Sequence, residues 1–275
     1  MTVVHHYTSV ETLALILATR KIRFNRLDQV DDVREAQQHR GIEFGKYFFV
    51  SCWTQAPEES IPQWHMYTDR MTGVRLTLPA APFKKKKMVL REGWLGEQSG
   101  NLYAPLSFEE IFGESYFVVP MFTDYKNFAG PVEYVNDVER RYSEAVEVGP
   151  SGITIRRPFD LVRFKSKDWN FQNEYRFFLF VLPSIPVPPE GPGSESFATR
   201  FPEHCSRSMI AGEPPGIEYI DLELSDDAFS QLVVTTGPLC SPGARVCVEA
   251  LVNTYAPAGR VASSCLTGTI RKPLR

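Results

Sequence analysis

The sequence predicts one α+β domain over residues 1–275, with two antiparallel or mixed sheets around a cleft and helices flanking them. Short apolar or alternating segments typical of strands recur along the chain, and helix-start signals fall between them. The run Phe177–Leu182 is apolar at every position, which is typical of a strand covered on both faces. With 275 residues and 43% hydrophobic content, the chain can bury the core that such a fold needs.

The first elements are a strand and a helix. Val3–Thr8 is typical of a strand, and Ser9 is a suitable N-cap for a helix over Val10–Leu17. Ile22–Phe24 predicts the next strand.

The segment that follows, Asn25–Glu35, is polar and unusually acidic. A solvated turn in which Asp31 or Asp32 caps a following helix accounts for the acidic residues. Because His5 and His6 stand close by in the sequence, a metal site remains as an alternative.

The middle of the chain predicts a buried strand, a helix and a half-buried strand. Tyr47–Trp53 is the buried strand, and Pro62 suits the first turn of a helix. On that helix Trp64 and Tyr67 are three residues apart and share a face, which is typical of core packing. The hydroxyl of Tyr67 could instead line a pocket. The alternation of Val74–Leu78 predicts the second strand.

The last part of the chain predicts further short elements and one long irregular insert. The expected strands are Tyr116–Val119, Val132–Val135, Ile217–Leu224, Val233–Thr236 and Val261–Ile270, and the expected helices are Glu139–Tyr142 and Ser241–Asn253. The segment 183–216 holds eight prolines, so we expect a Pro-rich loop without regular structure.

Glu174 and Arg176 stand at the start of the central strand. Alternation places both on the face of Phe178 and Phe180, where charges need a partner or a function. A structural ion pair between the two residues is one interpretation, and a functional site is the other.

Composition narrows the functional classes. The net charge of −3 and the isoelectric point near 6.0 give no overall basic field for nucleic acid. The lysine run Lys84–Lys87 is typical of a solvated connector, with phosphate or RNA contact as the alternative. Five scattered cysteines without a CxxC pair favour reduced thiols over disulfides or zinc. With neither a signal peptide nor an apolar run that could span a membrane, we expect a cytoplasmic protein without a membrane partner or a bound metal.

Several motifs in this order resemble a bacterial domain-of-unknown-function family, number twenty-nine seventy-one, which is itself similar to the ADP-ribosyltransferase-like fold. The motifs are His5–Ser9, Asp31–Glu35, Ser51–Thr54, Trp64–Tyr67 with Gly73–Val74, Lys165–Trp169 and Glu174–Arg176, with a similar strand and helix at Val233–Asn253. The resemblance implies an NAD-using transferase or NAD glycohydrolase, in the setting of a toxin or of phage defence. The acceptor, protein or nucleic acid, stays open.

The resemblance also implies site residues. It places catalytic roles on His6, Tyr67 and Glu174. It places contacts with NAD on His6, Thr8, Ser9, Trp64, Tyr67, Gln172 and Arg176. The segment Gln172–Glu174 resembles the Gln-x-Glu variant of the transferase signature, whereas the usual family sequence has an acid at the position of Gln172.

These residue types suit the chemistry of the nicotinamide–ribose bond. Cleavage passes through an oxocarbenium-like state, in which hydrogen bonds to the neighbouring 2-hydroxyl strengthen, and Glu174 could accept one. The ring of Tyr67 would stack on the cationic nicotinamide, and His6 would bond the other ribose or place a phosphate near the helix that Ser9 caps.

Two other functional classes remain. A nucleotide-binding or interaction module could keep the fold without turnover, and a His/Asp metal-dependent nuclease has less support. The enzyme hypothesis requires His6, Tyr67 and Glu174 to line one cleft. It also predicts that Arg176 pairs with Glu174 or reaches a ligand phosphate.

Overall fold

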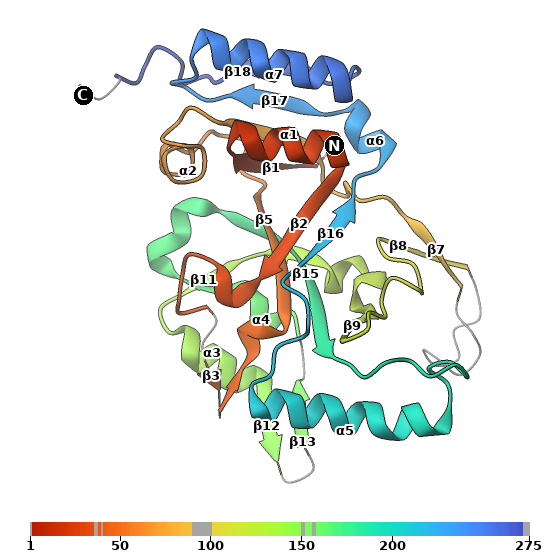
Figure 1. The fold of residues 1–275 in the computed structure, drawn as a ribbon. Helices are drawn as coiled ribbons and strands as arrows, with labels where there is room; N and C mark the ends of the chain where they lie inside the picture. Colours follow the sequence, from red (N-terminus) through yellow and green to blue (C-terminus); the bar gives the residue numbers. More distant parts are fainter. Residues whose placement is uncertain are drawn as a thin grey trace.

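The computed structural model describes residues 2–35, 38–39, 41–89, 101–149, 152–155 and 158–271. In this part of the chain a ten-stranded mixed sheet is accompanied by four two-stranded sheets and by helices (Figure 1). The strands of the large sheet are β1 (Val3–Thr8), β2 (Lys21–Arg26), β5 (Phe48–Thr54), β6 (Val74–Pro79), β9 (Tyr116–Val119), β10 (Ala129–Pro131), β15 (Glu174–Pro183), β16 (Tyr219–Glu223), β17 (Val233–Thr236) and β18 (Arg260–Ser263).

The smaller elements lie around this sheet. The two-stranded sheets pair β3 (Gln38–His39) with β4 (Ile42–Glu43), β7 (Lys86–Val89) with β8 (Asn101–Ala104), β11 (Glu133–Val135) with β14 (Phe164–Ser166), and β12 (Val146–Gly149) with β13 (Gly152–Ile155). The α-helices are α1 (Val10–Thr19), α2 (Ile61–Tyr67), α3 (Val138–Ala145), α4 (Asp160–Arg163), α5 (Glu195–Ala211), α6 (Asp226–Ser230) and α7 (Pro242–Tyr255). Short 3₁₀ turns are η1 (Leu27–Gln29), η2 (Phe44–Lys46), η3 (Pro120–Thr123), η4 (Tyr125–Asn127) and η5 (Lys167–Gln172).

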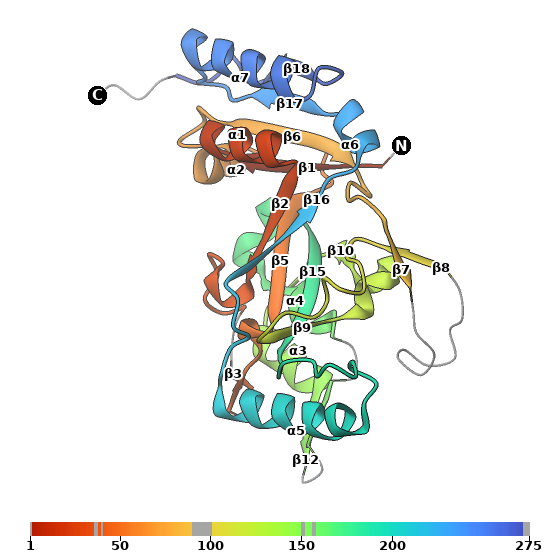
Figure 2. The same ribbon diagram turned by 45° about the vertical axis from the view of Figure 1, so that its right-hand side comes forward.

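Strand β5 is the junction of the large sheet. One half of β5 pairs with β2 through Phe49 and Val50, whereas Thr54 at its end pairs with His5 of β1. From this junction one arm continues through β1, β6, β17 and β18, and the other contains β16, β2, β5, β15, β9 and β10. The two arms run across one another in both views of the ribbon (Figures 1 and 2). The two sheets expected from the sequence are therefore arms of one continuous sheet, because β5 is shared by both.

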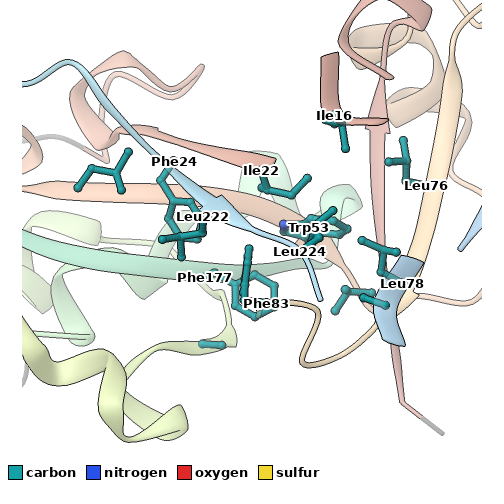
Figure 3. Close-up of a cluster of buried hydrophobic side chains, with 14 of the residues drawn as sticks. Ile16, Ile22, Phe24, Trp53, Leu76, Leu78, Phe83, Phe177, Leu222 and Leu224 are labelled. Carbon is teal, nitrogen blue, oxygen red and sulfur yellow. The ribbon is translucent and has the colours of Figure 1, made fainter. Parts of the chain in front are cut away.

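Strand β15 is covered on both faces, which confirms the interpretation of its apolar run. Phe177 and Leu179 belong to the main core, whereas Phe178 and Phe180 belong to a second cluster on the other face. Figure 3 shows Phe177 in the main core beside side chains from several other elements. Burial of each phenylalanine contributes about 1.5–3 kcal/mol, so the strand is firmly held.

The N-terminal strand and helix form as the sequence predicts. Ser9 accepts a hydrogen bond from the backbone N–H of Thr12 and so caps α1. Leu13 and Leu17 of α1 are buried in the main core, and α1 packs against α7. The strand β1 in front of this helix is thereby fixed between β5 and β6.

Two predicted segments differ from the structure. The insert 183–216 is not irregular throughout, because it contains the 17-residue helix α5. Ser194 caps the start of this helix and Gly212 ends it with a left-handed φ of 72°. All but one of the prolines lie outside the helix, and only Pro202 lies within it. The predicted last strand ends at Ser263, after which the chain continues in turns.

Candidate active site

A cleft of about 810 Å³ opens beside β1, β2 and β5, close to the point where the two arms of the sheet meet. Its lining includes side chains from β1, β5, β15, α1 and α2, from the segment after η1, and from β14. His6, Tyr67 and Glu174 all belong to this lining, although they are far apart in the sequence. The prediction that these three residues line one cleft is therefore confirmed.

His6 lines the cleft together with its β1 neighbours His5, Tyr7 and Thr8, and strand alternation places the side chains of His5 and His6 on opposite faces of β1. Its Nδ1 donates a hydrogen bond of 2.9 Å to the carbonyl of Cys52, and its ring lies 4.9 Å from that of Trp53. Burial lowers the pKa of His6, and the bond to Cys52 only partly offsets that effect. The ring is therefore neutral at pH 7, with Nε2 as an acceptor.

Thr8 and Ser9 follow His6, and only one of them lines the cleft. Thr8 is part of the lining, as the sequence predicts. Ser9 is not in the lining, and its hydroxyl oxygen is engaged in capping α1. The prediction that Ser9 contacts the ligand is therefore corrected to a structural role.

Tyr67 ends helix α2, which Ser60 caps. Its hydroxyl donates a hydrogen bond of 2.7 Å to Asp31 and accepts one of 2.5 Å from the side-chain amide of Gln172. Burial and the carboxylate of Asp31 raise the pKa of Tyr67, so the hydroxyl stays protonated. The ring is held at the cleft by contacts from two separate segments.

Trp64 does not share this position. Its side chain is fully buried beside Tyr7, and its indole N–H donates to Glu59. It is absent from the lining of the cleft. Trp64 is therefore a core residue, and the prediction that it contacts the ligand is wrong for this geometry.

The start of β15 places Glu174 at the cleft. Asn173 takes a left-handed conformation with φ of 43°, which asparagine tolerates, and it ends η5 just before the strand begins. The carbonyl of Asn173 accepts a hydrogen bond from Thr54, and the N–H of Glu174 donates to the hydroxyl of Tyr134. The backbone at this point is therefore fixed from two sides.

The carboxylate of Glu174 is only 5% exposed and is held by two cations. Arg176 donates to it through Nε at 2.5 Å and through Nη2 at 3.1 Å, and Lys165 donates at 3.1 Å. Burial alone would raise the pKa of Glu174, but Arg176 and Lys165 outweigh burial and lower it to about 2. The predicted pairing of Arg176 with Glu174 is confirmed, and Glu174 is ionised at neutral pH.

Glu35 is a member of this cluster that the sequence does not reveal. Its side chain is fully buried, and its carboxylate lies 2.8 Å from Nζ of Lys165 and 2.5 Å from Nη1 of Arg176. Among the described residues these contacts are ion pairs without good hydrogen-bond geometry. Two sequence features include Glu35, namely the acidic segment, for which a solvated turn is one interpretation, and the Asp31–Glu35 motif of the family resemblance, but neither predicts a buried partner for Glu35. Within the described residues Asp32 accepts a hydrogen bond from the N–H of Arg34 and caps no helix.

Gln172 and Cys52 complete the inner part of the cleft. The carbonyl of Gln172 accepts a hydrogen bond of 2.6 Å from Gln63, so Gln172 is tied to α2 by its backbone as well as its side chain. Cys52 is half-buried and lies opposite Arg176 in the β5–β15 pairing. Burial, with the charge of Glu174, raises the pKa of Cys52, so its thiol is protonated and poorly nucleophilic.

The structure gives little support to the metal site, the phosphate or RNA contact of the lysine run, or a membrane span. Within the described ranges no group of three or more His, Cys, Asp or Glu side chains could hold a metal ion. Of the lysine run, Lys84 and Lys86 pair with Glu223, and Lys86 also pairs with Glu110. In the same ranges no helix is long and apolar enough to cross a membrane.

Comparisons of this chain with protein-family models, with curated proteins and with solved structures found no match.

Proposed function

We propose that this protein is an NAD-dependent ADP-ribosyltransferase-like enzyme, acting as a transferase or as an NAD glycohydrolase. The observation that carries the proposal is the convergence of His6, Tyr67 and Glu174 on one cleft of about 810 Å³. A nucleotide-sized ligand fits clefts in this range of volumes. The motif resemblance supplies the reaction, and the geometry of the three residues is compatible with it.

Glu174 would act on the ribose. It is an ionised carboxylate with a pKa near 2, and it would accept a hydrogen bond from the 2-hydroxyl as positive charge develops on the ring. Because Arg176 and Lys165 hold its oxygens, little reorganisation would be needed when the charge forms.

Tyr67 and His6 would position the two ends of the ligand. Stacking of nicotinamide on the ring of Tyr67 would contribute roughly 0.5–2 kcal/mol of cation–π attraction. His6 keeps its Nδ1 on the carbonyl of Cys52, so its Nε2 would accept from a ribose hydroxyl. Thr8, beside His6 in the lining, would donate its hydroxyl to a phosphate oxygen.

A non-catalytic nucleotide-binding module is the second candidate, and the burial of Glu174 favours it. The carboxylate is 5% exposed, and both its oxygens already accept hydrogen bonds from Arg176 or Lys165. A carboxylate in this state could serve as part of a structural ion cluster while the cleft only holds a nucleotide.

Incubation of the purified protein with NAD, followed by chromatography for free nicotinamide, distinguishes the two candidates. Release of nicotinamide that saturates with NAD supports the enzyme. Calorimetric binding of NAD without release supports the binding module. If NAD neither binds nor reacts, the enzyme proposal is wrong, and a binding module is left only for a nucleotide other than NAD.

A further inference from the structure

Glu35 connects the acidic segment after η1 to the centre of the cleft. Neither a solvated turn nor a metal site explains a carboxylate with a fully buried side chain. Its position is held from a third direction, because the hydroxyl of Tyr142 donates to the backbone carbonyl of Glu35. A buried charge of this kind is costly unless it is paired, and both its partners also hold Glu174.

Two carboxylates thus share two cations. Lys165 lies 2.8 Å from Glu35 and 3.1 Å from Glu174, and Arg176 lies 2.5 Å from each. Without Glu35, the positive charges of Lys165 and Arg176 would no longer be shared with a second carboxylate and would act on Glu174 alone. The carboxylate would then be a weaker acceptor for a ligand hydroxyl and a weaker stabiliser of developing positive charge.

The same segment also reaches the aromatic side of the cleft. Asp31, four residues before Glu35, accepts the hydrogen bond of 2.7 Å from the hydroxyl of Tyr67. Glu35 therefore fastens to β14 and β15 the segment whose other end holds Tyr67. In this way Glu35 adds a second tie between the ring of Tyr67 and the carboxylate of Glu174, beside the direct hydrogen bonds of Gln172 to Tyr67 and Gln63.

We propose that Glu35 is a positioning residue that sets both the charge balance of Glu174 and its distance from Tyr67. The expected effect of Glu35 on turnover rests on the proposed function, whereas its effect on the positions of the cleft residues does not. It does not need Glu35 to touch the ligand.

Glu35→Gln tests this proposal, with Asp168→Asn as its matched control. Asp168 holds the same segment through Arg34 at 2.8 Å, but the contact is exposed and lies outside the buried cluster. We expect Glu35→Gln to lower kcat by about 10- to 100-fold, as small displacements of catalytic groups do. The dissociation constant of ADP-ribose should stay unchanged or fall, because the cleft becomes more positive. Asp168→Asn should match the parent in both measurements.

A second readout does not depend on activity. Cys52 lies at the inner end of the cleft, and its reaction with iodoacetamide can be followed by mass spectrometry of its peptide. Loss of the ion pairs of Glu35 should let the segment around Cys52 open more often, which should raise the labelling rate of Cys52 severalfold relative to Asp168→Asn. If Glu35→Gln does not fold, Glu35→Gln combined with Lys165→Gln keeps the cluster neutral, and its labelling should still rise.

The outcomes separate this inference from the proposed function. Nicotinamide release by the parent that is unchanged in Glu35→Gln would overturn the positioning role. Labelling of Cys52 equal to that of the Asp168→Asn control would overturn it as well, whether or not NAD reacts. A parent that does not react with NAD, combined with faster labelling in Glu35→Gln, would reject the enzyme and retain the positioning role.

Discussion

Two clusters of ion pairs lie near the short β11–β14 sheet, and they differ in the solvent exposure of their side chains. The buried cluster joins Glu35, Lys165, Glu174 and Arg176, whose side chains are at most 5% exposed. The surface cluster joins Glu133, Arg141, Glu144 and Arg163, whose side chains are between 31% and 51% exposed. Arg163 also pairs at 3.5 Å with Asp160, whose side chain is 7% exposed.

The contact lengths of the two clusters are similar. They run from 2.5 to 3.1 Å in the buried cluster and from 2.8 to 3.4 Å in the surface cluster. Solvent therefore makes the difference, since water screens the exposed charges and lowers the cost of separating them. The buried charges must stay paired, and their pairing fixes the positions of Lys165, Glu174 and Arg176 in the lining of the cleft.

Arg176→Ala should have the largest effect on stability. It would leave Glu35 and Glu174 competing for Lys165 alone in a buried site. Breaking a buried pair in this way costs about 3–5 kcal/mol in the free energy of unfolding. Urea denaturation of the variant and the parent measures the difference, and a loss of unfolding free energy below about 1 kcal/mol would show that the buried cluster behaves like a surface one.

Glu174→Gln tests whether the buried cluster serves catalysis. Glutamine keeps the volume and one acceptor oxygen but removes the charge. A carboxylate that stabilises the developing cation should lose about 2.7–4 kcal/mol of transition-state stabilisation, which is roughly 100- to 1000-fold in turnover. The dissociation constant of NAD should change little. Steady-state nicotinamide release and calorimetry provide the two values, and equal turnover in variant and parent would assign Glu174 a structural role.

The free energy of unfolding at low pH should depend on the protonation of Glu174. Burial opposes ionisation of Glu174, but Arg176 and Lys165 lower its pKa from 4.5 to about 2 in the folded protein. The unfolded chain therefore binds this proton more readily, so the stabilisation is complete above pH 4.5 and is lost as the pH falls to about 2. We expect a loss on the order of 3 kcal/mol across this window.

Glu174→Gln serves as the reference for that measurement. It has no carboxylate to protonate at this position, so its own loss of stability should be smaller. The difference in unfolding free energy between parent and variant should shrink as the pH falls. Parallel stability curves for the two proteins would contradict the lowered pKa.

Arg141→Ala should have the smallest effect. Arg141 pairs with Glu133 at 2.8 Å and with Glu144 at 3.4 Å, but these carboxylates are well exposed. Exposed pairs contribute about 0.2–1 kcal/mol, and Arg163 remains on Glu133 in the variant. Urea denaturation should place the variant within that range of the parent. A loss as large as that of Arg176→Ala would remove the distinction between the two clusters.

The sequence by itself determined the local elements of this protein. The strand β1, the Ser9 cap of α1 and the doubly covered β15 follow from alternation, capping and the apolar run, which are interactions within a few residues. The pairing of Glu174 with Arg176 is of the same kind, because they are neighbours on one face of one strand.

Only the tertiary structure decided which of these residues share a cleft and which do not. Trp64 and Tyr67 lie on one short helix, but the packing buries Trp64 beside Tyr7 and leaves Tyr67 at the cleft. Glu35 could not be assigned, because its partners Lys165 and Arg176 lie more than a hundred residues away in the chain. The physical reason is that burial of a charge depends on every segment around it, whereas sequence patterns report only the nearest neighbours.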